Sequence, residues 1–113
     1  MINEDTIEFY NSRLTIDVSS LKSLSPAQKD KVRHYGSLAE ALLKNKDLAM
    51  FIHHCKFELA DRLASIGGHT LDDNAQRIAI SNELAGIDNF ITGLKRAVYW
   101  KNRIGNTNEV PST

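Results

Sequence analysis

Three consecutive residues, His53, His54 and Cys55, are the side chains of this sequence best suited to bind a metal ion or to act as a nucleophile. Neighbouring residues on a helix point roughly 100° apart, whereas helical ligands that share an ion stand three or four residues apart. Only Glu58, four residues after His54, has such a spacing, which gives two ligands at most. The segment therefore predicts no metal site. Cys55 falls on an apolar stripe, so a buried structural thiol is expected.

A second group, His69, Asp72 and Asp73, has the residue types of acid–base catalysis. Thr70, Asp72 and Asp73 are also ordinary residues for the first turn of a helix, and this second interpretation is favoured. The sequence has no glycine-rich phosphate loop, no G-x-S-x-G and no H-E-x-x-H motif. We therefore expect a protein that is not an enzyme and that needs no cofactor.

The composition is that of an ordinary soluble domain, with 113 residues of which 42% are hydrophobic and 25% charged. The 14 basic and 14 acidic residues cancel, so the bulk charge gives no support to nucleic-acid binding. One cysteine fits a reducing compartment, and the acidic first residues are unlike a signal peptide. No apolar run reaches the ~18 residues that span a bilayer. These features predict a cytoplasmic protein without a membrane segment.

A capping pattern marks the start of the first long helix. Ser25, Pro26 and Gln28 form a capping box with proline in the first turn, which predicts a helix over 26–44. Whether that helix breaks at Gly36-Ser37 is left open by the sequence. Before it, we expect a short helix over 3–13 with Ile7, Tyr10 and Leu14 on its apolar face, then an extended connector over 14–25.

Two further helices follow. Apolar residues recur in steps of three and four from Asp47 to Ile66, which predicts a helix over 47–66. Gly67-Gly68 is expected to end it in the left-handed cap conformation. Thr70 and Asp73 then form a capping pattern for a helix over 71–104, with Gly105 as its stop. The expected domains are an N-terminal segment at 1–25, a helical domain at 26–105 and a polar tail at 106–113.

The last helix carries two parallel stripes. One is a heptad of Ile80, Leu84, Ile87, Ile91, Leu94 and Val98. The other contains Ala79, Gly86 and Gly93, each seven residues apart. Because a glycine costs a helix about 1 kcal/mol relative to alanine, we expect another backbone or a bulky side chain to fill these notches. The alternative is that both glycines face solvent.

Helix lengths predict how the elements pack. Residues 71–104 make a helix of about 50 Å and 47–66 one of about 30 Å, so folding one on the other leaves about 20 Å of apolar helix uncovered. That part is covered by the helix over 26–44, by a second copy of the chain, or by both. The predicted fold is all-α, an antiparallel helical hairpin of 47–66 and 71–104 that joins the helix over 26–44 in a coiled-coil-like three-helix bundle.

Basic residues gather in two places. Lys29, Lys31, Arg33 and His34 lie on the first long helix, and Lys95, Arg96, Lys101 and Arg103 lie beside Tyr99 and Trp100 at the end of the last. A folded-back chain brings the groups together, and basic residues with aromatic neighbours can hold a nucleic acid or a nucleotide ligand. Cations at the end of a helix also complement its dipole, which accounts for the second group without a ligand. Lys95, Arg96, Lys101 and Arg103 remain candidate phosphate contacts.

The segment "LAEALLKNKDLAMFIHHCKFELADRL", the glycine turn and the heptad helix ending "LKRAVYWKNR" together resemble small helical-hairpin proteins encoded among the morphogenesis genes of tailed bacteriophages. The resemblance covers about residues 37–103 and rests on layout, so it transfers no functional residue. It implies a structural role by oligomerisation or by docking onto a larger virion part, in the host cytoplasm or the virion. "GLKRAVYW" is also similar to small phage anti-defence proteins that oligomerise and sequester a nucleotide signal.

The leading hypothesis is a non-enzymatic protein that forms a homo-oligomer or docks onto a larger assembly through its last helix. The residues expected at this interface are Ile80, Leu84, Gly86, Ile87, Phe90, Ile91, Gly93, Leu94, Val98 and Trp100. The alternative is a helical binder of nucleic acid or of a nucleotide-type ligand, such as a regulatory or anti-defence factor. Glycine notches that face bare solvent would count against an assembly role.

Overall fold

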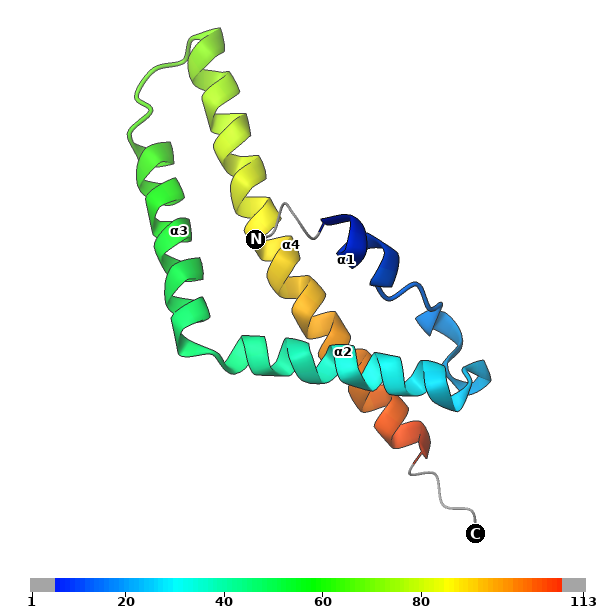
Figure 1. The fold of residues 1–113 in the computed structure, drawn as a ribbon. Helices are drawn as coiled ribbons and strands as arrows, with labels where there is room; N and C mark the ends of the chain where they lie inside the picture. The colour runs from blue at the N-terminus through cyan, green and yellow to red at the C-terminus, as the bar shows by residue number, and fades with distance from the viewer. Residues whose placement is uncertain (1–5, 109–113) are drawn as a thin grey trace.

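The chain is all-helical over residues 6–108, which the computed structural model describes. Its elements are α1 (Thr6–Ser12), the 3-10 helix η1 (Val18–Ser23), α2 (Pro26–Lys44), α3 (Lys46–Ala64) and α4 (Leu71–Asn108), as Figure 1 shows. No strand occurs within that range. The predicted all-α class is therefore confirmed, and the expected positions 3–5 of the short first helix lie outside the described residues.

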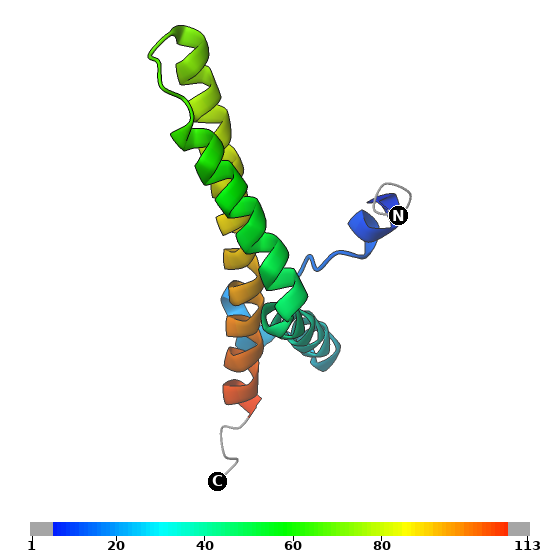
Figure 2. The same ribbon diagram turned by 90° about the vertical axis from the view of Figure 1, so that its left-hand side faces the viewer.

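The helices form an extended body rather than a compact one. Helices α3 and α4 run in opposite directions on either side of residues 65–70, while α2 crosses the second half of α4 steeply (Figures 1 and 2). The radius of gyration is 19.2 Å, against about 13 Å for a compact domain of this length. A three-helix bundle needs three nearly aligned axes, so the predicted bundle is not confirmed. We call α3, residues 65–70 and residues 71–93 the arm, and the remainder the base.

Helix α2 begins and ends as its sequence predicts. The Ser25 hydroxyl accepts from the Gln28 backbone N–H at 3.2 Å, and the Gln28 side chain accepts from the Ser25 N–H at 2.9 Å. The helix continues through Gly36 without a break. Asn45 then serves both helices, since its N–H donates to the Leu42 carbonyl and its side chain accepts from the Leu48 N–H. One residue between two helices leaves α3 pointing steeply away from α2 (Figure 1).

The turn between α3 and α4 is built differently from the prediction. No glycine of the described range has a positive φ, so the expected left-handed cap at Gly67-Gly68 is wrong. Ser65 ends α3 in the right-handed region, and its N–H donates to the Asp61 and Arg62 carbonyls. The last-turn carbonyls accept from the Ser65 and Ile66 N–H groups, and the Arg77 guanidinium donates to the carbonyls of Ile66 and Gly68 in the turn itself.

Helix α4 starts where the sequence predicts and runs beyond its expected end. The Thr70 hydroxyl accepts from the Asp73 N–H at 3.1 Å, and the Asp73 carboxylate accepts from the Thr70 N–H at 3.2 Å. The predicted stop at Gly105 is wrong, because the helix continues to Asn108. A single glycine costs a helix only about 1 kcal/mol, and the preceding Ile104 is fully buried.

The hydrophobic core lies in the base. Leu21, Val32 and Ile104 are its buried residues, and the partly buried side chains packed against them are Leu14, Ile16, Leu24 and Trp100. The predicted extended connector is therefore wrong in part, since η1 places Leu21 in this core. The Tyr35 hydroxyl accepts from the Leu14 N–H at 3.1 Å and holds the connector on α2. Of the predicted apolar face of the first helix, Ile7 and Tyr10 are exposed, whereas Leu14 packs against the core.

Helices α2 and α4 meet most closely at Gly36. Val32, Gly36 and Ala39 are the buried residues of α2, at the spacing of one helical face. A Cβ built on Gly36 would overlap the Lys101 Cβ and would come within 2.9 Å of the Ala97 carbonyl oxygen. Close backbone approach therefore occurs in this chain, at a glycine of α2 rather than of α4.

Charged residues also form ion pairs at the crossing of α2 and α4. Lys101 Nζ donates to Glu40 Oε2 at 2.7 Å, and Lys44 Nζ donates to Glu40 Oε1 at 3.1 Å. The hydrogen bond from Lys101 and then that from Lys44, with their charges, lower the pKa of Glu40 from 4.5 to about 2. The Glu40 side chain is about a third exposed, so solvent and salt weaken the pair.

Replacing Gly36 with alanine tests the crossing. We expect the added methyl group to separate α2 from α4 at a cost of about 1–3 kcal/mol, more than the ~1 kcal/mol that alanine gains in a helix. The free energy of unfolding from urea titration should therefore fall. Gly105→Ala is the matched control, since nothing lies within 4 Å of its added Cβ, and it should be neutral or stabilising. An equal increase in the free energy of unfolding for both variants would contradict the close contact at Gly36.

Acid should weaken the crossing through Glu40. A carboxylate whose folded pKa is lowered stabilises the fold above its unfolded pKa, and that stabilisation disappears as the pH falls from 4.5 toward 2. We expect Glu40→Gln to be less stable than the natural chain at pH 6 and equal to it near pH 2, by urea titration at low salt. Glu58→Gln, which removes a carboxylate outside the crossing, is the control. A difference that persists unchanged to pH 2 would contradict this role.

Candidate protein-binding groove

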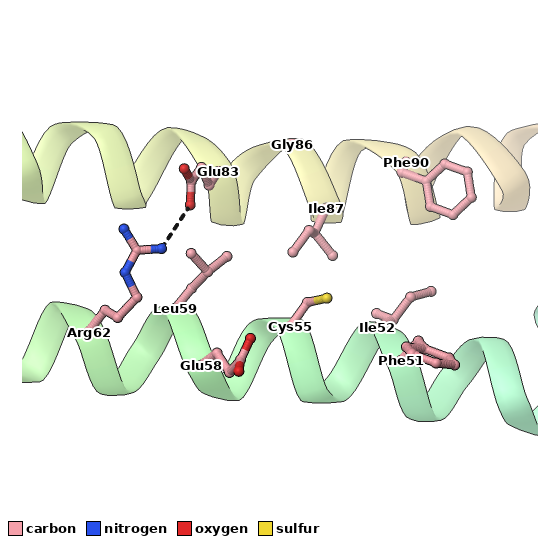
Figure 3. A pocket seen from close by; sticks show the side chains of 10 residues that line it. All are labelled: Phe51, Ile52, Cys55, Glu58, Leu59, Arg62, Glu83, Gly86, Ile87 and Phe90. Atoms are coloured by element: carbon pink, nitrogen blue, oxygen red, sulfur yellow. Dashed lines mark ion pairs between the residues drawn. The ribbon is translucent and has the colours of Figure 1, made fainter. Parts of the chain in front are cut away.

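An open apolar groove runs along the arm between α3 and α4 (Figure 3). Its volume is about 580 Å³. The residues that line it come from both helices and are Phe51, Ile52, Cys55, Glu58, Leu59, Arg62, Glu83, Gly86, Ile87 and Phe90. Most of this lining is hydrocarbon, which is typical of surfaces that bind another molecule rather than water.

The groove has a charged end and an aromatic end. Toward the turn at 65–70, Arg62 and Glu83 approach each other to 3.6 Å across the groove (Figure 3). Toward the base, Phe51 and Phe90 are 63% and 49% exposed. Cys55 and Ile87 lie between the two ends, and Ile52 lies beside Phe51 (Figure 3). The polarity therefore changes in one direction along the arm.

The groove is open because α3 and α4 touch along little of their length. Leu59 and Ile80 are the buried residues of the arm, and Lys56 bridges to Asp88 at 3.0 Å. The axes of α3 and α4 move apart toward the base, where α2 leads into α3 and crosses α4 (Figure 1). The apolar face of each helix is consequently only partly covered by the other.

The exposure of Cys55 differs from the sequence prediction. The predicted buried thiol is wrong, because Cys55 is exposed and faces the groove. It does lie on the apolar face of α3, as its spacing indicates, but that face is not closed at this level. A stripe in a sequence identifies a face and does not tell how completely the face is covered.

The residues first considered for chemistry have structural partners. His54 Nε2 lies 3.4 Å from Glu58 Oε1, the pair that the sequence suggests. Asp73 caps α4, and Asp72 accepts from the Gln76 side chain at 2.9 Å. In the part of the chain that the structure describes, no three His, Cys, Asp or Glu side chains come close enough to hold a metal ion.

The predicted interface residues of α4 divide into three sets. Ile80, Leu84, Ile87, Ile91, Leu94 and Val98 are buried or half-buried, and Ile91 and Leu94 line a hollow with Leu42, Leu43 and Leu48. The heptad stripe is thus largely the face that packs within the chain. Trp100 belongs to the core of the base. Gly86 and Phe90 line the groove, and Gly93 is exposed outside it.

The predicted filling of the glycine notches does not occur within the chain. A Cβ built on Gly86 or on Gly93 meets nothing within 4 Å, so neither α2 nor α3 fills these notches. The crossing places α2 against Ala97 and Lys101 instead. Within the chain both glycines therefore face open space, which counts against an assembly role, and the case for assembly rests on the groove and its aromatic residues.

The basic residues are partly engaged. Lys101 is paired with Glu40, and Arg33 is paired with Asp30 at 2.7 Å. Lys95 and Arg96 are exposed on α4. The contact of Val32 with Ile104 brings the basic segments of α2 and α4 to the same end of the molecule, as predicted. Phosphate binding by Lys95, Arg96, Lys101 and Arg103 stays a prediction, weakened by the carboxylate on Lys101.

Sequence reasoning missed several residues of the groove. Phe51, Glu58, Arg62 and Glu83 lie beside the apolar stripes rather than on them. The signal that could have found them is Phe51 next to Ile52, because an aromatic residue flanking a stripe widens the apolar face of the helix.

Comparison of the chain with known protein families, with characterised proteins and with solved structures gives no match. Among the helices described, none is both long and apolar enough to cross a membrane.

The reactivity of the Cys55 thiol measures how open the groove is. Because Cys55 is exposed and is the single cysteine of the chain, we expect it to react in the dilute folded protein within about tenfold of its rate in denaturant. The measurement is the rate of labelling by a maleimide, followed by mass spectrometry. A thiol that stays unreacted until the protein unfolds would contradict an open groove.

Proposed function

We propose that this protein is a non-enzymatic assembly component that associates with further copies of itself through the groove of the arm. One observation carries the proposal, the largely apolar lining of the groove, with Phe51 and Phe90 at one end, that the chain leaves uncovered. Aromatic residues are enriched in protein interfaces relative to the rest of the surface.

The amount of exposed surface supports the same proposal. The chain exposes 8706 Å², whereas a compact monomer of this mass exposes about 6,200 Å². The excess over a compact monomer is roughly 2,500 Å² for the chain as a whole. A stable interface of standard size needs about 800 Å² from each partner. The excess is therefore large enough to supply one such interface.

The resemblance of the sequence to phage morphogenesis proteins supports the same role. In the proposed assembly, α3 and α4 of each copy form an antiparallel hairpin, and association covers the groove residues that packing within the chain leaves open. Docking onto a larger particle would use the same surface.

Substitution of Phe90 with aspartate tests the proposal. Phe90 is about half exposed in the single chain, so the charge should leave the helical content unchanged. We expect it to weaken association by about 2 kcal/mol or more, as for other central aromatic residues. Light scattering should then give a mass above 12.7 kDa for the natural chain and a lower one for Phe90→Asp.

Phe57→Asp is the matched control, because Phe57 is 67% exposed on the same arm but lies outside the groove. It should keep the oligomeric mass. Leu94→Asp is less informative, since Leu94 lines the hollow with Leu42 and Leu43 rather than the groove, so its loss tests a different surface. A natural chain of monomeric mass at high concentration, or Phe57→Asp as disruptive as Phe90→Asp, would overturn the proposal.

A further inference from the structure

We infer that the occupant of the groove is the groove of a second copy, with both arms pointing in the same direction about a two-fold axis that runs along them. The inference rests on the proposed self-association and adds its geometry. A two-fold interface pairs one surface patch with itself, so the groove must be complementary to its own copy. Two orientations satisfy that condition, with the arms either side by side in the same direction or reversed.

The polarity of the groove distinguishes the two orientations. Its turn-side end carries Glu58, Arg62 and Glu83, and its base-side end carries Phe51 and Phe90. Reversed arms would lay the phenyl groups of each copy over the charged groups of the other, at both ends of the interface. Placing the carboxylates of Glu58 and Glu83 against a phenyl ring is costly, because nothing there replaces their hydration.

When both arms point in the same direction, the aromatic ends of the two grooves meet each other, and so do the charged ends. Phe51 and Phe90 of each copy meet those of the other and bury each other's exposed rings. At the opposite end, Arg62 and Glu83 already lie at one level, 3.6 Å apart. Rotation about a two-fold axis along the arms keeps each residue at the same height and places α3 of one copy opposite α4 of the other. Arg62 of each copy therefore also faces Glu83 of the other.

The open notch at Gly86 fits this arrangement. Gly86 precedes Phe90 by one helical turn on the groove side of α4, and nothing lies within 4 Å of a Cβ at that position. The notch thus offers room for a side chain that the second copy places at the level of Gly86. A notch that no residue of its own chain fills is then occupied in the dimer.

The orientation is measured by the distance between arm tips. His69 is exposed in the turn between α3 and α4, and lies roughly 20 Å along the arm from the middle of the groove. Arms in the same direction put the two tips within about 20 Å of each other, since packed helices lie 8–10 Å apart. Reversed arms put them about 40 Å apart.

The experiment is pulsed electron–electron double resonance on the full chain in which His69 is replaced by p-acetylphenylalanine and labelled with a ketone-reactive nitroxide, so that Cys55 in the groove stays unchanged. A distance near 20 Å supports the inference. A distance near 40 Å in a dimer overturns the inference and leaves self-association standing. A monomeric mass for the natural chain overturns both. Gly86→Leu supplies a second readout, because a filled notch predicts a weaker dimer and an unfilled one predicts no change in its mass.

Discussion

The close approach of α2 to α4 at Gly36 is the contact on which the rest of the structure depends. Without a side chain at that position, Val32 can reach Ile104, and Lys101 can lie flat beside α2 and pair with Glu40. The crossing is steep, and Asn45 alone joins α2 to α3. The start of α3 is therefore held away from α4, so the two helices converge only toward their turn (Figure 1). The groove is a geometric consequence of the crossing.

This arrangement divides the stability of the molecule unevenly. The base contains the core of Leu21, Val32 and Ile104, while the arm buries only Leu59 and Ile80. Helices in water derive most of their stability from a packed apolar face rather than from propensity. An arm with a half-covered face is consequently the part of the chain that gains most from a second copy, and the proposed assembly would stabilise it without changing the base.

Local signals of the sequence predicted the helices well, because caps act between residues three apart. Ser25 with Gln28 and Thr70 with Asp73 form the bonds that their spacing indicates. The same sequence misplaced the close helix contact, which lies at Gly36 rather than at Gly86 and Gly93. Which glycine meets a neighbour depends on a crossing angle fixed by many residues together, and a repeat of seven along one helix does not determine it. Cys55 was misjudged for the same reason, since its exposure depends on how far α3 stands from α4.

The central claim is that the arm is completed by a second copy while the base is complete by itself. Amide hydrogen exchange followed by mass spectrometry over a series of dilutions tests this most directly. The account predicts that protection of residues 48–64 and 71–90 falls as the protein is diluted, while protection of residues 28–44 and 94–104 stays constant. Protection that is the same at every concentration in both regions would contradict it.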